Sequence, residues 1–193
     1  MSTSTPSAAP SPIAHRRGAE LALAVGGFGI GTGEFAIMGL LPNVAKDLAI
    51  SIPQAGHVIS IYALGVVIGA PVIATLAARL SRRTLLLLLM VLFAVGNIAS
   101  ALSSSYGNLM VFRFISGLPH GAYFGVASLV AASMAGVGQR AKAVGRVMLG
   151  LTLATLLGSP LATWIGQLMG WRAAFVMVGV IGALTALLVM LWL

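Results

Sequence analysis

The sequence predicts an all-α membrane protein with six transmembrane helices, and three observations lead to that class. Of the 193 residues, 59% are hydrophobic and only 7% are charged, whereas a soluble domain carries roughly a quarter charged residues. The apolar segments are continuous over about twenty residues, which is the length of a spanning helix. They also lack the alternation of apolar and polar residues that is typical of membrane-barrel strands. A lipid bilayer is therefore the expected surrounding.

The elements follow in order from the N-terminus. Residues 1–17 are rich in Ser, Pro and Ala and are expected to form a disordered cytoplasmic tail, with a six-helix transmembrane domain over residues 18–193. A cleaved signal peptide is not favoured, because further spans follow the first. Since every connector is short, none can hold a soluble catalytic or nucleotide-binding domain. The helices are expected at residues 19–41, 54–78, 84–103, 107–131, 141–168 and 172–193.

The basic residues indicate topology. The net charge of +8 does not indicate nucleic-acid binding, because these residues form short clusters between the spans without interleaved stacking aromatics. Two of them, Lys46 and Arg172, fall on one side of the membrane. Eight fall on the other side: Arg16, Arg17, Arg79, Arg82, Arg83, Arg140, Lys142 and Arg146. The positive-inside bias then predicts a multi-pass protein of the cell (plasma or inner) membrane with a cytoplasmic N-terminus.

Catalytic and metal chemistry are not indicated. Cysteine is absent, which excludes disulfides and thiolate ligands. The three histidines, His15, His57 and His120, fall on separate segments without ligand spacing. No nucleophile–base pair is visible, so an enzyme is not expected. No Walker motif is present, so we expect neither a cofactor nor an ATP-driven pump, unless a partner chain supplies one.

Two ionisable residues lie well inside predicted spans. Glu34 is about seven residues from the outer end of the first helix, and Arg113 is about six residues into the fourth, which places both roughly 10 Å below the outer surface. Opposite charges at matching depth suggest a direct or water-bridged pair. Intramembrane ionisable residues usually face a bundle interior or a wet cavity. Glu34 and Arg113 are thus the proton-coupling candidates; a purely structural ion pair, or an outward-snorkelling arginine, is the alternative.

The fourth helix carries a face that can line a cavity. Arg113, Gly117, His120 and Phe124 recur at three- and four-residue steps, so they share one side of the helix. His120 and Phe124, together with Met38 of the first helix, are the substrate-cavity candidates. The alternative for this face is close helix packing through small residues, with His120 satisfying a hydrogen bond.

Glycines and prolines inside the spans indicate packing and bends. Gly27, Gly29, Gly31 and Gly33 of the first helix are interpreted as a packing surface, because no lysine follows them to make a phosphate-binding loop. In addition, a proline follows a glycine by two positions in three spans, which permits kinks where other groups satisfy the freed carbonyls. The three are Pro71, Pro119 and Pro160.

These motifs together resemble the N-terminal half of a major facilitator superfamily transporter, in the branch of proton-coupled drug and sugar-efflux proteins near the arabinose-efflux and chloramphenicol-efflux types. The resemblance covers essentially residues 20–193. It implies half of a major facilitator fold, in which six helices form a three-plus-three inverted repeat. The motifs that carry it are residues 31–35 with 39–42, residues 62–71, the basic connector after them, Arg113 with Gly117, and residues 158–160.

The resemblance also implies roles for single residues. Arg113 matches an arginine associated with proton coupling. Gly158 and Pro160 match the helix-bend motif of antiporters, although Ser159 stands between them and Thr163 replaces a usual glycine. The implied function is a proton-coupled efflux antiporter of a small organic solute, such as a drug or sugar.

The connector after the second helix resembles the basic part of the family's cytoplasmic motif. Arg79, Arg82 and Arg83 are the implied cytoplasmic-gate residues, but Ala78 replaces the aspartate of that motif. The arginines are therefore expected to find helix-end carbonyls, lipid phosphates or other carboxylates instead.

The length leaves two functional classes open. The family has two six-helix halves and this sequence carries one, so the expected partners besides lipid, solute and protons are a missing C-terminal half or a second copy. The competing class is a membrane interaction or assembly subunit without transport activity of its own. A further six hydrophobic spans encoded beyond residue 193 would distinguish the two.

Overall fold

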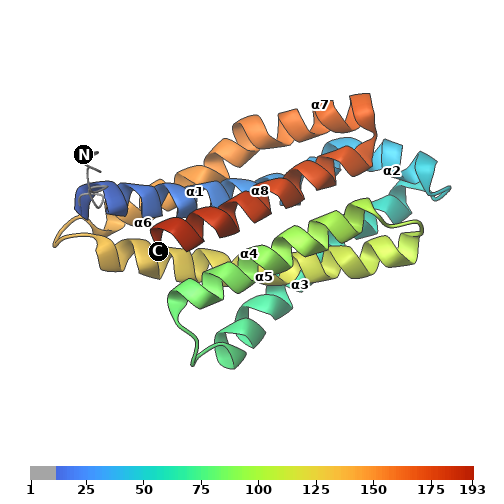
Figure 1. Cartoon of the computed structure of the whole chain (residues 1–193). Helices are drawn as coiled ribbons and strands as arrows, with labels where there is room; N and C mark the ends of the chain where they lie inside the picture. The colour runs from blue at the N-terminus through green and yellow to red at the C-terminus, as the bar shows by residue number, and fades with distance from the viewer. Residues whose placement is uncertain (1–11) are drawn as a thin grey trace, which may run out of the picture.

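A computed structural model describes residues 12–193 as a bundle of helices, and no strand occurs in that range (Figure 1). Six helical segments are long and apolar enough to cross a membrane. The first segment combines α1 (Pro12–Phe35), a 3-10 turn η1 (Ala36–Leu40) and α2 (Leu41–Asp47). The second to fourth are α3 (Ile52–Leu76), α4 (Arg82–Ala101) and α5 (Tyr106–Met134). The fifth combines α6 (Arg140–Leu153), a π-turn η2 (Ala154–Gly158) and α7 (Ser159–Met169), and the sixth is α8 (Trp171–Trp192).

The six predicted helices are confirmed, and the first is longer than expected at both ends. It continues beyond residue 41 to Asp47, because Pro42 occupies the first turn of α2, where a missing N–H costs nothing. Residues 12–17, expected in the disordered tail, belong to α1 instead. The remainder of that predicted tail, residues 1–11, lies outside the described residues.

Serine side chains mark where three of the spans begin. The side chains of Ser51, Ser81 and Ser105 accept hydrogen bonds from the backbone N–H three residues later, at the starts of α3, α4 and α5. Such caps satisfy N–H groups that have no partner within the helix. At the α7–α8 junction Gly170 has a φ of 91°, a left-handed conformation that favours glycine. These residues fix short connectors and hold neighbouring spans antiparallel.

The helix contacts follow a three-plus-three inverted repeat. The first three spans (α1 to α4) correspond in order to the last three (α5 to α8). The α3–α5 contact matches the α1–α6 contact, and the α4–α5 contact matches the α1–α8 contact. The α4–α8 contact pairs equivalent helices across the pseudo-two-fold axis. Because each repeat has an odd number of spans, the second repeat starts from the opposite end of the bundle.

Glycines allow the two equivalent helix crossings to be close. A Cβ atom at Gly117 would overlap the carbonyl oxygen of Tyr62, where α5 crosses α3. At the matching α1–α6 crossing, a Cβ at Gly150 would overlap the carbonyl oxygen of Ala24, and Gly27 lies against the backbone of Val147. The interpretation of Gly27 as a packing position is therefore confirmed, and at Gly117 the alternative of close helix packing is observed.

Two prolines lie within continuous helices, and the third follows a π-turn. Pro71 lies inside α3 and Pro119 inside α5. Pro160 lies in the first turn of α7, directly after η2, whose last residue Gly158 packs against Thr32 of α1. Proline cannot donate the ladder hydrogen bond, and π-turns shift the hydrogen-bond register, so these positions are the local weak points of the spans.

Both described chain ends lie at the same end of the bundle, called here the N-terminal end (Figure 1). The His15 ring lies 6.1 Å from the Trp192 ring, which brings the start of α1 next to the end of α8. The α3–α4 and α5–α6 connectors lie at this end as well. Eight of the eleven basic residues are therefore gathered here, whereas Lys46 and Arg172 lie at the opposite end.

Candidate functional site

Glu34 is the next-to-last residue of α1, directly before the 3-10 turn η1. Its side chain is 31% exposed, so the carboxylate is neither enclosed in the core nor fully open. One carboxylate oxygen lies 3.9 Å from Nε2 of His120 on α5, within ion-pair distance but too far for a hydrogen bond. The sequence brought Glu34 and His120 into consideration separately, and the fold places them face to face.

Arg113 lies on α5 and is fully buried. One terminal nitrogen donates a hydrogen bond of 3.1 Å to the carbonyl oxygen of Gly33 on α1. The guanidinium carbon lies 4.2 Å from the ring centre of Tyr62 and 5.1 Å from that of Phe175. Cation–π contacts of this kind are strongest when the cation is removed from water. Two aromatic faces and a backbone carbonyl thus hold the buried charge.

A direct or water-bridged pair was expected between Arg113 and Glu34, and the direct form is not among the ion pairs of the described residues. The guanidinium contacts the peptide carbonyl directly before Glu34 instead. Its Nε and second terminal nitrogen have no hydrogen-bond partner within the described part of the chain. The matching depth of Arg113 and Glu34 therefore predicted correctly that they lie near each other, but not which atom Arg113 contacts.

His120 connects Glu34 to α3. Its Nδ1 lies 3.1 Å from the hydroxyl of Tyr62. A carboxylate can only accept hydrogen bonds, so a neutral His120 suits both neighbours when Nε2 carries its proton toward Glu34 and Nδ1 accepts from Tyr62. The ring also lies 5.4 Å from the ring of Phe124, one turn further along α5. His120 thus makes a packing hydrogen bond and still faces the acid.

These contacts form a closed polar loop of α1, α3 and α5, called here the Glu34 loop. Its members are Glu34, His120, Tyr62, Arg113 and the carbonyl of Gly33. Tyr62 is central, since its hydroxyl meets His120 and its ring stacks on Arg113. Sequence reasoning missed Tyr62, although a tyrosine inside an apolar span needs a partner for its hydroxyl and could have been a signal.

The other two cavity candidates are the apolar residues Phe124, which packs beside His120, and Met38. Phe124 is half-buried, and its ring lies 5.8 Å from that of Tyr123. Met38 lies in η1, about one helical turn beyond Glu34, and is 49% exposed. Neither side chain takes part in the polar contacts, so both are apolar surroundings of the loop.

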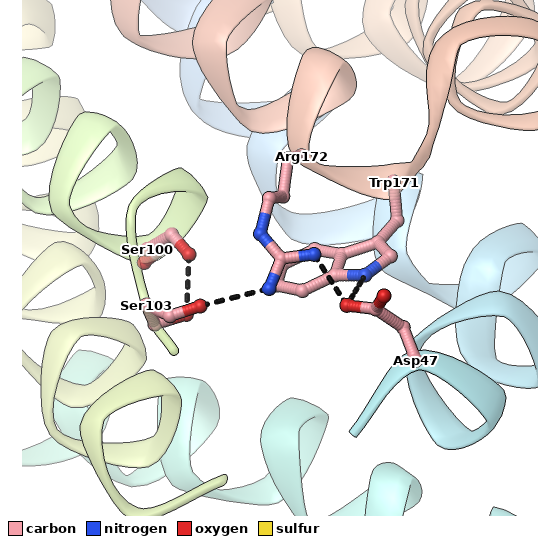
Figure 2. Close-up of polar contacts among 5 residues, drawn as sticks. All are labelled: Asp47, Ser100, Ser103, Trp171 and Arg172. Carbon is pink, nitrogen blue, oxygen red and sulfur yellow. Dashed lines mark hydrogen bonds and ion pairs between the residues drawn. The ribbon is translucent and has the colours of Figure 1, made fainter. Parts of the chain in front are cut away.

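Two further polar clusters lie at the ends of the bundle, and sequence reasoning missed both. At the N-terminal end, the buried Glu20 of α1 accepts a 2.7 Å hydrogen bond from Arg146 of α6, with Arg16 3.6 Å away. At the opposite end, Asp47 accepts hydrogen bonds from Arg172 and from the Trp171 ring (Figure 2). Each carboxylate joins helices that are far apart in sequence, which local patterns do not reveal.

The cluster around Asp47 links three segments of the chain by hydrogen bonds. Arg172 also donates a 3.0 Å hydrogen bond to the carbonyl of Ser103, and the Ser103 hydroxyl donates to Ser100, as Figure 2 shows. One hydrogen-bonded cluster therefore connects the end of α2, the α4–α5 connector and the start of α8.

The predicted gate arginines lie around the α3–α4 connector. Arg83 donates a 2.8 Å hydrogen bond to the carbonyl of Met190 near the end of α8, which agrees with the expected helix-end partner. Arg79 and Arg82 are exposed. No group of three or more metal-ligating side chains occurs within the described range.

The sequence is similar to known membrane transport proteins. The sequence model of the Major Facilitator Superfamily matches residues 23–193. The inner membrane transport protein YdhP of Escherichia coli is 47% identical over 165 residues, covering 86% of this chain and 42% of YdhP. A chloramphenicol resistance protein of Streptomyces lividans is 34% identical, covering 79% of this chain and 39% of that protein.

A solved structure has the same fold. The proton:xylose symporter XylE bound to 6-bromo-6-deoxy-D-glucose superposes with a TM-score of 0.81 at 17% identity, covering 94% of this chain and 45% of XylE. The chain therefore spans less than half the length of the proteins that it matches here.

Proposed function

The chain belongs to the Major Facilitator Superfamily, and on that premise we propose that its six spans serve as the N-terminal half of a proton-coupled efflux transporter for a small organic solute. A chloramphenicol resistance protein and an inner membrane transport protein among its relatives support the transport of a small, drug-like solute. The single observation that carries the proton coupling is the partly exposed carboxylate of Glu34 facing His120 inside the bundle.

Glu34 is the proposed proton acceptor. As a carboxylate it attracts the Nε2–H of His120 across 3.9 Å, which draws α1 and α5 together. Protonation of Glu34 removes that attraction and leaves His120 bonded to Tyr62 of α3. Proton binding thereby weakens one of the polar contacts between α1 and α5, while the Arg113–Gly33 bond remains. Intramembrane acids placed in this way are typical of proton paths. Solute and proton are proposed to use the same cavity alternately.

Arg113 is the proposed fixed partner of that acid. Its hydrogen bond to Gly33 anchors the last turn of α1, directly before η1 begins. The charge stays in place between two aromatic rings while Glu34 changes protonation. Arg113 therefore lies beside the backbone of Glu34 without forming a direct ion pair with its carboxylate. His120, Phe124 and Met38 are the proposed solute contacts.

We further propose that the N-terminal end faces the cytoplasm of a plasma or inner membrane. Its excess of basic residues supports this orientation. Arg79, Arg82 and Arg83 would then act at the cytoplasmic gate, and the bond of Arg83 to the end of α8 offers one latch without the missing aspartate. The π-turn ending at Gly158, followed by Pro160, is the proposed bend for antiport.

Transport in proteoliposomes tests this proposal. The chain is reconstituted alone and, in parallel, in a longer version that carries a second six-helix half, and a panel of labelled drugs and sugars is offered under an imposed pH gradient. We expect the longer version to move at least one solute against its gradient, and a protonophore to stop it. Movement that ignores the pH gradient would contradict proton coupling. Inactivity of both versions across the panel would favour an assembly subunit.

A further inference from the structure

A cluster of charged side chains occupies the N-terminal end of the bundle between α1 and α6. Four cations surround one carboxylate: Arg16 and Arg17 come from α1, Lys142 and Arg146 from α6, with Glu20 between them. We call these five residues the Glu20 cluster. Glu20 holds Arg146 at 2.7 Å and Arg16 at 3.6 Å, so two of the cations are fixed in position.

The cluster is not neutral. Four cations against one carboxylate leave three positive charges. The whole chain has only three acidic residues, and the other two, Glu34 and Asp47, lie far along the first span. In addition, the buried Nε of Arg16 lies 3.6 Å from Glu20 and has no hydrogen-bond partner within the described residues. Three excess positive charges around one carboxylate favour the binding of a further anion.

The shape of the surface suggests which anion. A hollow of about 270 Å³ is lined at one side by Arg17, Glu20 and Arg146 and at the other by the apolar Leu21 and Ala24. A narrower crevice of about 20 Å³ reaches the remaining members, Arg16 and Lys142. The basic side chains therefore lie next to an apolar floor, formed by Leu21 and Ala24, which is further along α1 toward the middle of the span.

This hollow opens away from the interior of the bundle. The carbonyl of Leu23 accepts a hydrogen bond from Tyr123 of α5, and the Leu23 side chain is buried. Leu21 is two residues earlier, which places it about 200° around the helix from Leu23, and it is 61% exposed. The floor of the hollow therefore lies on the outer surface of this six-helix bundle, opposite the side of α1 that packs on α5.

We propose that the Glu20 cluster binds the phosphate headgroup of an anionic phospholipid, with one acyl chain lying over Leu21 and Ala24. The phosphate lies among Arg16, Arg17, Lys142 and Arg146, while Glu20 orients the two arginines that it holds. Basic pockets between membrane helices recognise anionic headgroups in this manner. The site bridges α1 and α6, and it depends neither on transport nor on which side of the membrane this end faces.

Native mass spectrometry of the detergent-purified chain tests the site. The chain is titrated with phosphatidylglycerol and, separately, with phosphatidylcholine of the same acyl chains. The double variant Arg17→Gln/Lys142→Gln removes the two cations that Glu20 does not hold. The control Arg79→Gln/Arg82→Gln removes the same charge at the same end of the bundle. Circular dichroism confirms that each variant is folded.

We expect phosphatidylglycerol to bind more tightly than phosphatidylcholine. Since each basic residue near an anionic headgroup contributes about fivefold, the Arg17/Lys142 variant should bind phosphatidylglycerol about 30-fold more weakly. The Arg79/Arg82 control should lose clearly less affinity than the Arg17/Lys142 variant, because its exposed arginines lie outside the Glu20 cluster. Equal losses in both variants, or no preference between the lipids, would overturn the site. Equal competition by glycerophosphoglycerol, which has no acyl chains, would overturn its assignment to a lipid.

Discussion

Replacing Gly117 with alanine should destabilise the bundle, because the new methyl group would overlap a backbone atom. A Cβ at residue 117 meets the carbonyl oxygen of Tyr62, with the Cα of Gly65 close behind. Backbone cannot rotate away as a flexible side chain can, so α3 and α5 must move apart. Overpacking of this kind costs about 1 to 3 kcal/mol. Alanine recovers about 0.5 to 1 kcal/mol of helix propensity, so the net loss should be about 0 to 2.5 kcal/mol.

Gly125 on the same helix is the matched control. A Cβ there meets nothing within 4 Å, so Gly125→Ala should gain the propensity term alone. The difference between the two variants then isolates the steric cost, about 1 to 3 kcal/mol. The free energy of unfolding would be measured by circular dichroism in mixed micelles with increasing dodecyl sulfate. Gly150→Ala, at the equivalent α1–α6 crossing, should behave like Gly117→Ala. Equal stability of Gly117→Ala and Gly125→Ala would refute the close crossing.

Three other substitutions probe the polar contacts by the same unfolding assay. Tyr62→Phe removes the hydrogen bond to His120 but keeps the ring over Arg113, and should cost about 1 kcal/mol; no loss would mean that the bond does not form. Arg113→Lys loses the planar stacking on the two rings and should lower the free energy of unfolding by about 2 kcal/mol. An unchanged free energy of unfolding would mean that this stacking does not stabilise the bundle. Asp47→Asn weakens the contact with the half-exposed Arg172 and should cost about 1 kcal/mol or less. High salt should reduce that cost, and an unchanged cost in 0.5 M NaCl would contradict an ionic contribution.

The sequence alone predicted the class and the order of the spans, because continuous apolar length is a one-dimensional property. It also predicted the packing role of Gly27, since a small residue inside a span allows a neighbouring helix to approach closely, but it did not single out Gly150. It missed the extension of the first span to Asp47, because Pro42 was taken as the end of a helix rather than the start of α2. A proline after a short 3-10 turn looks the same in sequence as a proline after a helix.

The candidate site was predicted in part. Residue number gives the depth of a side chain in a span, and depth correctly brought Glu34 and Arg113 into one neighbourhood. It does not give the rotation of each helix about its axis, which decides whether Arg113 meets the acid or the Gly33 carbonyl beside it. Tyr62 and Glu20 were missed for the same reason, since their partners lie on helices distant in sequence.

Proton coupling through Glu34 is tested most directly by substituting it and following solute export driven by a pH gradient. The longer version of the protein is compared as parent, Glu34→Gln and Glu34→Asp, with Asp47→Asn as a control that removes a carboxylate away from the Glu34 loop. If Glu34 carries the proton, Glu34→Gln abolishes gradient-driven export, while Glu34→Asp and Asp47→Asn retain it. Export by Glu34→Gln that still follows the pH gradient would contradict the proposed role.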